Sequence, residues 1–306
     1  MPHNLLKNKK GIIFGALDNK SIAWKVAELV KAEGGEIILT NAPVALRMGE
    51  INKLGGELDS PIIPADATNI SELENLTQKA LEHFKGKFDF VLHSIGMSLN
   101  VRKKRHYTNQ NHEWTKKGWD ISALSFHKVL QVMYEKDALN KWGSIVALTY
   151  IAAQRTFPNY NDMADNKAYL ESIARSFGYF FGKNKKVRVN TISQSPTRTT
   201  AGQGVEGLEN FLNFSEKTSP LGNASAFECA QYVVSLFSDF TRNWGTNAVT
   251  LTLNGSKYQG NTSPAPVYDT NGETVHIVYS GSTQGWIPIN DGAVALETPQ
   301  TYSIEY

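Results

Sequence analysis

Two tyrosines and one lysine in the middle of the chain, Tyr150, Tyr160 and Lys167, have side chains that can donate protons and hold sugar hydroxyls. Tyr160 and Lys167 stand seven positions apart, so on one helix they would share a face about two turns apart. A phenol is a good proton donor to a developing enolate or alkoxide, and a nearby ammonium favours phenolate character and can hold ribose hydroxyls. The spacing is consistent with a catalytic pair, although a tyrosine and a lysine at this distance also occur on ordinary helix surfaces.

The turn that follows the first expected strand is a second candidate site. In doubly wound α/β proteins a dinucleotide pyrophosphate binds at this turn, on the N-terminus of the next helix. Here the turn has one glycine, Gly15, and Ser21 can cap a helix that begins at Ile22. An ordinary capped loop would contain the same residues, so the turn by itself favours neither interpretation. Arg47, after the second expected strand, could meet a 2′-phosphate or lie in solvent.

Alternating strand and helix patterns over roughly the first 250 residues would position these side chains. Strands are expected at residues 11–15, 36–40, 60–64, 88–93, 143–150, 186–193 and 248–253. Helices are expected at residues 22–34, 69–86, 120–137, 160–182 and 224–240. Right-handed βα repeats of this length predict an α/β fold, a doubly wound parallel sheet of the Rossmann type with about seven strands.

The character of the sequence changes after about residue 255. Residues 256–306 contain short alternating apolar and polar runs without a helix pattern, and Asn271-Gly272 is a hairpin-turn signal. We therefore expect a Rossmann-type domain at residues 1–255 and a short β-rich C-terminal extension or arm at residues 256–306.

Composition limits the class of protein. A formal charge of +2 over 306 residues gives no general attraction to nucleic acid or membrane, and no apolar run is long enough to cross a bilayer. The N-terminus lacks a signal-peptide pattern, and the single cysteine, Cys229, excludes an internal disulfide. The seven histidines lack metal-ligand spacing, so we expect no metal site and expect His93 and Cys229 to be structural. These features predict a soluble, cytoplasmic protein without a nucleic-acid or membrane partner.

Taken in order, the motifs resemble the bacterial NADH-dependent enoyl-acyl carrier protein reductases, a divergent branch of the short-chain dehydrogenase/reductase superfamily, over roughly residues 11–243. The pair Tyr150 and Tyr160, followed by Lys167, is the signature on which the resemblance mainly rests. It implies that the protein reduces the trans-2 double bond of an enoyl-acyl carrier protein thioester with NADH, NADPH not being excluded, in fatty-acid elongation. It also implies a homo-oligomer, the family's usual tetramer.

The resemblance assigns a role to each matching residue. Tyr160 would hydrogen-bond the substrate thioester oxygen, Lys167 would anchor the nicotinamide ribose, and Tyr150 would line the pocket. The implied cofactor-binding residues are Gly15, Ser21 and Ile22 at the pyrophosphate, Asp66 and Ala67 at the adenine, Ser94, Ile95 and Gly96 at the adenosine ribose, and Ile192 and Thr197 at the nicotinamide carboxamide. Residues 197–214 would form a mobile cover over the substrate.

Departures from related patterns bear on two alternative functions. Ketoreductases of the superfamily place the lysine four positions after the tyrosine, where this chain has Ala164, which argues against a carbonyl reductase. The family ends with an Asp-Gly-Gly-Phe type of run, whereas residues 253–256 here are Leu-Asn-Gly-Ser, and the tail beyond has no counterpart in the family. The alternatives are therefore another short-chain carbonyl reductase, or a non-catalytic reductase-like scaffold that carries a β tail.

A basic cluster follows the strand expected at residues 88–93. It comprises the run Arg102 to Arg105, with Lys116 and Lys117 further on. The cluster is either a solvated loop or a docking patch for an acidic acyl carrier protein, bound through charge complementarity.

Overall fold

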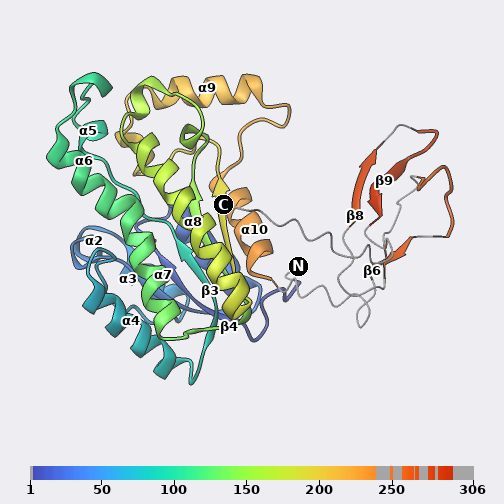
Figure 1. Ribbon diagram of the computed structural model, residues 1–306, viewed down its shortest axis with the longest axis horizontal. Helices are drawn as coiled ribbons and strands as arrows, with labels where there is room; N and C mark the ends of the chain where they lie inside the picture. Colours follow the sequence, from blue (N-terminus) through green and yellow to red (C-terminus); the bar gives the residue numbers. More distant parts are fainter. Residues whose placement is uncertain are drawn as a thin grey trace, which may run out of the picture. The chain divides into compact units, whose positions relative to one another are not determined.

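The computed structural model describes residues 3–238, 249–250, 257–264, 266–268, 275–279 and 282–291. Contacts divide the chain into two units, residues 1–239 and residues 240–306. Among the described residues, unit 1 holds a parallel sheet with its helices, and unit 2 holds short antiparallel strand pairs (Figure 1).

Five parallel strands form the sheet of unit 1, in the order β2-β1-β3-β4-β5. The strands are β1 Lys10–Phe14, β2 Glu36–Thr40, β3 Phe88–His93, β4 Leu139–Thr149 and β5 Arg188–Ser193. The strand order reverses between β1 and β3, and ligands of doubly wound sheets bind beyond the carboxyl ends of the strands at such a switch point. The predicted α/β fold with a Rossmann-type parallel sheet is confirmed.

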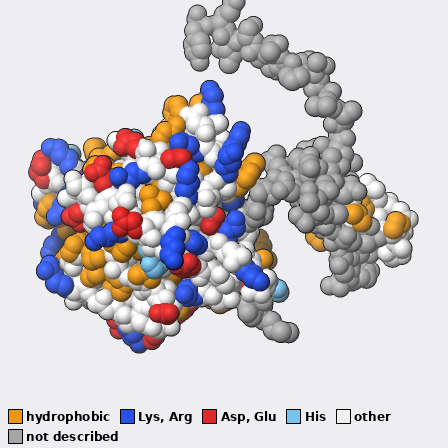
Figure 2. Space-filling view, turned by 90° about the horizontal axis from the view of Figure 1, so that it is seen from below, with side chains coloured by type: hydrophobic (Ala, Val, Ile, Leu, Met, Phe, Trp, Pro, Cys, Tyr) orange, Lys and Arg blue, Asp and Glu red, His pale blue; other side chains and the backbone are white. Residues whose placement is uncertain are grey.

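Two layers of helices cover the two faces of this sheet. The first layer contains α4 Ile70–His83, α7 Ser125–Glu135 and α8 Met163–Lys185, and the second contains α1 Ile22–Ala32, α3 Ile51–Glu57 and α10 Ala226–Phe237. Successive residues of β1 alternate between the two cores, Ile12 and Phe14 facing the first and Ile13 the second. On the face of the molecule shown in Figure 2, basic and acidic side chains are interspersed. No helix among the described residues is long and apolar enough to span a membrane.

The strand expected at residues 60–64 is wrong. Ile62 forms only an isolated bridge with Leu39, and two hydrogen bonds, Leu39 N to Pro61 O and Ile63 N to Leu39 O, accompany it. Pro61 and Pro64 have no N–H to donate, so this segment cannot continue a ladder.

The strand expected at residues 248–253 is described only at β6 Val249–Thr250, and the rest lies outside the described residues. β6 pairs antiparallel with β7 Val267–Tyr268 and does not join the parallel sheet. β8 Val275–Tyr279 and β9 Trp286–Asp291 form a second antiparallel pair, while the expected turn Asn271-Gly272 lies outside the described residues.

The helix expected at residues 160–182 begins later than predicted. Tyr160 lies in the 3-10 turn Pro158–Tyr160, Asn161 follows with a left-handed φ of 50°, and α8 begins only at Met163. Tyr160 and Lys167 therefore do not share a helix, and the helical-face argument for them is wrong.

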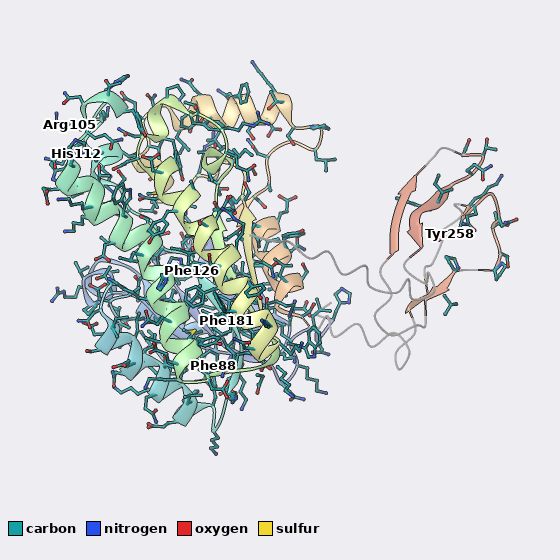
Figure 3. The ribbon with its side chains drawn as sticks, in the orientation of Figure 1. Phe88, Arg105, His112, Phe126, Phe181 and Tyr258 are labelled. Atoms are coloured by element: carbon teal, nitrogen blue, oxygen red, sulfur yellow. The ribbon has the colours of Figure 1, made fainter. Side chains whose placement is uncertain are left out.

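Four further helices among the described residues were not expected from the sequence. α2 Pro43–Met48 and α3 follow β2, and the short α5 Leu99–Arg102 and α6 His112–Trp119 occupy what the sequence favoured as a polar loop. α6 begins at His112, close to Arg105 (Figure 3), and a π-helical turn at Asp120–Leu124 joins it to α7. Asn100 bonds both Thr115 of α6 and Asp162, so α6 lies close to the turn that carries Tyr160.

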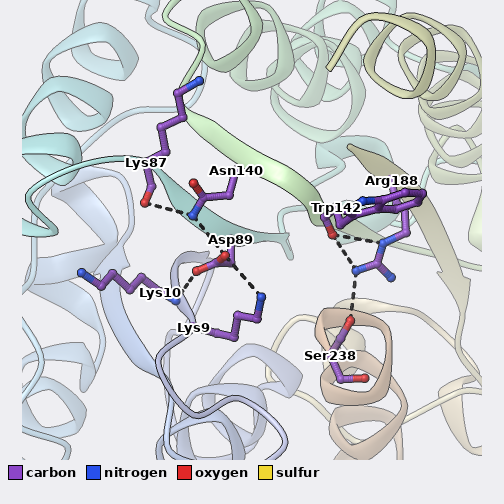
Figure 4. A network of polar contacts seen from close by, with 8 residues as sticks. All are labelled: Lys9, Lys10, Lys87, Asp89, Asn140, Trp142, Arg188 and Ser238. Carbon is purple, nitrogen blue, oxygen red and sulfur yellow. Dashed lines mark hydrogen bonds and ion pairs between the residues drawn. The ribbon is translucent and has the colours of Figure 1, made fainter. Parts of the chain in front are cut away.

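A polar network closes the amino ends of the strands (Figure 4). Asp89 accepts hydrogen bonds from the backbone N of Lys10 at 3.0 Å and from Nδ2 of Asn140 at 3.1 Å. Arg188 donates to the carbonyl of Ser238 at 3.0 Å, which ties the start of β5 to the end of α10. These bonds stabilise the edge of the sheet opposite to the carboxyl ends, where the candidate site lies.

Candidate functional site

A groove of about 1090 Å³ lies at the carboxyl edge of the sheet. Residues that follow β1, β2, β3, β4 and β5 all line it, as expected for the ligand site of a doubly wound sheet. The predicted site residues that line it are Gly15, Ser21, Ile22, Asp66, Ala67, Ser94, Ile95, Gly96, Tyr150, Tyr160, Lys167 and Thr197. Ile192 does not line the groove, because its side chain points into the core with α10 and is 7% exposed.

The turn after β1 brings two strand ends close together. Gly15 has a φ of +92°, and a Cβ at this position would lie 2.0 Å from the carbonyl oxygen of Ser94. Only glycine fits both the left-handed backbone and this close approach. Ser21 then caps α1 by accepting a hydrogen bond from the backbone N of Trp24 at 3.3 Å, so the positive end of the helix dipole opens into the groove.

Asp66 lies in the loop beyond β2, and one of its carboxylate oxygens is engaged in hydrogen bonds. Its Oδ1 accepts hydrogen bonds from the backbone N of Thr68 at 2.9 Å and from Oγ1 of Thr68 at 2.7 Å. The backbone N of Asp66 donates to Glu72 at 2.8 Å, which fixes the loop. Within the described residues Oδ2 has no hydrogen-bond partner, so it can accept from a ligand amino group in the groove.

The two tyrosines contact each other, and the lysine lines the same groove. The rings of Tyr150 and Tyr160 lie 4.9 Å apart, and Tyr150 also contacts Phe157 at 5.3 Å. Lys167 is only 8% exposed, and its Nζ donates a hydrogen bond to the carbonyl oxygen of Leu148 at 2.7 Å. An ammonium has three N–H donors, so two remain for a ligand.

Burial sets the protonation of this cluster. It raises the pKa of Tyr160 well above its usual value, with a further contribution from Tyr150, so the phenol stays protonated at neutral pH. Burial lowers the pKa of Lys167 to about 8, against the attraction of Glu171. The side chain of Tyr160 therefore keeps its proton and is suited to donating a hydrogen bond.

Comparisons with known proteins match the part of the chain that forms the groove. A family model described as "Enoyl-(Acyl carrier protein) reductase" matches residues 15–251, most of the chain and every groove-lining segment. The chain belongs to the enoyl-acyl carrier protein reductase family.

Individual relatives agree with this assignment. An NADH enoyl-[acyl-carrier-protein] reductase of Rhizobium meliloti is 31% identical over 78% of this chain and 88% of its own length. The structure of a FabI–NADH complex from Alistipes finegoldii is 62% identical, with a TM-score of 0.77 over 78% of this chain and 84% of that one. A Bacillus cereus enoyl-acyl carrier protein reductase solved with NADP+ is 28% identical, with a TM-score of 0.72 over 79% of this chain and 93% of that one.

In this enoyl-acyl carrier protein reductase, the segment expected to cover the substrate lies over the groove. It includes the 3-10 turn Gly202–Gly204 and α9 Leu208–Thr218, and Phe211 of α9 contacts Phe157 at 5.6 Å. Oγ1 of Thr200 donates a hydrogen bond to Asp18 in the turn after β1. The cover thus contacts both the turn after β1 and Phe157, which packs against Tyr150.

Sequence reasoning missed several apolar residues of this reductase's groove. These are Met163, Leu208 and Phe211, with Phe157 behind Tyr150. The apolar residues at helical spacing in α9 were a usable signal, since Leu208, Phe211 and Leu212 share one face.

His93 and Cys229 have the environments of structural residues. His93 is fully buried, its Nε2 lies 2.9 Å from Oγ of Ser125, and burial together with the charge of Lys167 lowers its pKa to about 3. Cys229 is buried, which raises the pKa of its thiol to about 12. No group of residues that could hold a metal ion is found in the described part of the chain.

Proposed function

We propose that this protein reduces the trans-2 double bond of an enoyl-acyl carrier protein thioester by hydride transfer from NADH, a step of fatty-acid elongation. One observation carries the proposal: a phenol kept protonated by burial, Tyr160, lines the same groove as the buried ammonium of Lys167 and the N-terminus of α1. A hydrogen-bond donor for an oxyanion and a set of dinucleotide contacts thus occupy one site.

Tyr160 supplies the stabilisation of the transition state. Bound NADH would supply hydride to the β-carbon of the conjugated thioester, leaving NAD+, and a proton from solvent would complete the reduction at the α-carbon. As the hydride is transferred, negative charge develops on the thioester oxygen, and the Tyr160 hydroxyl donates a hydrogen bond to it. A donor of this kind typically contributes roughly 3–4 kcal/mol. The raised pKa of Tyr160 keeps the donor in place throughout the neutral range.

Three features of the groove fit a nicotinamide dinucleotide. The N-terminus of α1, capped by Ser21, offers free backbone N–H groups to a pyrophosphate. Asp66 Oδ2 is open to an adenine amino group, and the two remaining N–H groups of Lys167 are open to ribose hydroxyls. In this assignment Lys167 binds and orients the cofactor, while Tyr160 acts on the substrate.

The adenosine end of the groove favours NADH over NADPH. The groove-lining residues after β2 include Asn41, Ala42 and the acidic Glu50. Arg47 is exposed and is not among the lining residues, so a 2′-phosphate at this end would meet a carboxylate and no described arginine or lysine.

Turnover of a short trans-2-enoyl thioester with NADH tests the proposal. We expect Tyr160→Phe to lower kcat by roughly 10²–10³-fold, because it removes only the oxyanion donor. Tyr107→Phe is the matched control, since Tyr107 is 53% exposed and, among the described residues, its hydroxyl bonds only with Asp165. Turnover of Tyr160→Phe equal to that of Tyr107→Phe would contradict the role of Tyr160.

The basic cluster supports docking of the carrier protein at the mouth of the groove. Arg102 and Lys117 line the groove, and Lys103 is exposed beside them. None of the three has an ion-pair partner in the described part of the chain, whereas Lys104 pairs with Glu206 at 3.6 Å. Unpaired positive charge at an entrance complements the acidic surface of an acyl carrier protein.

Exposed aromatic side chains, the extent of the family match and the cysteine content bear on assembly, domain organisation and location. Three aromatic side chains on the outer face of α8, Tyr169, Tyr179 and Phe180, are 43%, 59% and 53% exposed, which supports a homo-oligomer, and the resemblance favours a tetramer. The family match ends at residue 251, close to the end of a reductase domain at 1–255 that precedes a β-rich extension at 256–306, whereas contacts divide the chain earlier, between residues 239 and 240. A single, buried cysteine supports the cytoplasm as its location. A solution molar mass of one 33.9 kDa chain would exclude the tetramer.

A further inference from the structure

A buried carboxylate lies directly behind Tyr160. Asp162 follows Tyr160 by two positions, and its side chain has no exposure to solvent. Its Oδ1 accepts a hydrogen bond from Oγ of Ser98 at 2.5 Å, and its Oδ2 accepts one from Nδ2 of Asn100 at 2.7 Å. No ion pair to Asp162 is found within the described residues, so these hydrogen bonds compensate for its burial.

The two donors are held by neighbouring elements. Ser98 is the N-cap of α5 Leu99–Arg102 and accepts a hydrogen bond from the backbone N of Val101 at 3.0 Å. Asn100 donates a hydrogen bond to Oγ1 of Thr115 on α6 at 3.0 Å. Asp162 is therefore the end of a hydrogen-bonded network that runs through α5 and α6.

Asn161 connects the same network to the strained turn. Its Oδ1 accepts from the backbone N of Asp162 at 2.8 Å and from Nε2 of Gln110 at 2.5 Å, and its Nδ2 donates to the carbonyl of Arg105. A non-glycine residue with a φ of 50° persists where surrounding contacts hold it in place. Both residues between Tyr160 and α8 are thus bound to the segment between β3 and α6.

The hydroxyl of Tyr160 itself has no hydrogen-bond partner within the described residues. The position of its oxygen depends on the backbone turn and on ring contact with Tyr150. We propose that Asp162 is a positioning residue that fixes this turn and so aims the Tyr160 hydroxyl at the substrate oxygen. Asp162 acts through Tyr160 and does not line the groove. The inference rests on the proposed function, because turnover is its first readout.

Asp162→Asn tests the inference with minimal change in shape. An amide has one oxygen and one NH2 where the carboxylate has two oxygens, so at the positions of Oδ1 and Oδ2 it can accept from only one of Ser98 and Asn100. We expect kcat with an enoyl thioester to fall by roughly tenfold or more, since small misplacements of a catalytic group are costly. The Kd for NADH should be unchanged, because the turn after β1 and Lys167 are not altered. Asp165→Asn is the control, since the Asp165 carboxylate accepts, within the described part of the chain, only long hydrogen bonds, of 3.3 and 3.4 Å, from an exposed tyrosine. It should leave both quantities unchanged.

A double mutant distinguishes positioning from general destabilisation. In a Tyr160→Phe background, Asp162→Asn should cause no further loss of kcat, because the hydroxyl that it positions is already absent. Loss by the same factor in both backgrounds, or a parallel rise in the Kd for NADH, would overturn the inference. If Asp162→Asn does not fold, Ser98→Ala removes the donor to Oδ1 and must show the same non-additivity.

Amide hydrogen exchange provides a readout that does not depend on turnover. Exchange of the backbone amides of residues 159–163 should be faster in Asp162→Asn than in Asp165→Asn, because the turn is no longer held. Wild-type protein without enoyl thioester turnover would refute the proposed function while this measurement still tests the turn. Equal exchange in both variants would refute the role of Asp162.

Discussion

At the residue scale, Lys167 is a cation placed where a cation is costly. Its pKa is lowered from 10.5 to about 8, so below pH 8 both the folded and the unfolded protein carry its charge and the folded state bears the burial cost. Between pH 8 and 10.5 the folded protein loses the proton first, and stability rises with pH. The site thus retains a lysine that weakens the fold, as expected of a residue kept for binding.

Replacing this lysine by an apolar residue of similar shape should reveal how much the buried charge destabilises the folded state. We expect Lys167→Met to increase the free energy of unfolding at neutral pH, by at most about 3 kcal/mol from the pKa shift, less the lost hydrogen bond to Leu148. The gain should shrink as pH rises from 8 to 10.5, while NADH binding is lost. Urea unfolding without cofactor at neutral and alkaline pH measures it, and a gain that does not vary with pH would contradict the assignment.

His93 makes the stability of the fold sensitive to acidic pH. Its pKa is lowered to about 3, so as pH falls below 6.5 the unfolded chain takes a proton that the folded protein does not. We expect the free energy of unfolding to fall by about 2 kcal/mol as the pH is lowered from about 7 to 5. His93→Gln should remove this pH dependence. His83→Gln, on a ring that is 40% exposed, should keep it. Urea unfolding across this range would show whether the slopes of the two variants differ.

At the element scale, the sequence patterns predicted the buried strands but missed the start of a helix that is set by contacts between loops. β1, β2 and β3 were found because their apolar runs are covered on both faces. The start of α8 was missed because the turn at Asn161 is held by contacts to Arg105 and Gln110, far away in sequence. The motif led to residues that line the groove, whereas Asp162 has no local signature in the sequence.

The close approach of β1 and β3 gives an element-scale prediction. Gly15→Ala would place a methyl group 2.0 Å from the Ser94 carbonyl in a left-handed backbone. We expect it to destabilise the protein by about 2 kcal/mol or more and to weaken NADH binding, because the strand ends must separate. Gly56→Ala is the control, since a Cβ there meets nothing within 4 Å in the exposed face of α3, and a gain of roughly 0.5–1 kcal/mol is expected. Thermal unfolding and fluorescence titration with NADH compare the two, and equal stability would contradict the steric argument.

At the scale of the whole molecule, the formal charge of +2 is too small to steer an acidic partner by itself. Basic and acidic groups are interspersed on the face shown in Figure 2, so attraction must come from local excess charge such as Arg102 and Lys117, which line the groove, and the exposed Lys103. Local attraction acts on a carrier protein but not on a short uncharged thioester, which separates docking from chemistry.

The salt dependence of turnover tests this separation. We expect Lys103→Ala/Lys117→Ala to lower kcat/KM for a carrier-bound enoyl substrate by roughly tenfold at low ionic strength, because electrostatic steering acts on the encounter. The loss should fade as salt screens the charges over about 10 Å, and kcat/KM for the short thioester should not change. Lys79→Ala/Lys141→Ala removes two exposed charges that do not line the groove and should behave as wild type. An equal loss with both substrates would mean that the two lysines support the groove itself, because only a docking role makes the defect depend on the carrier.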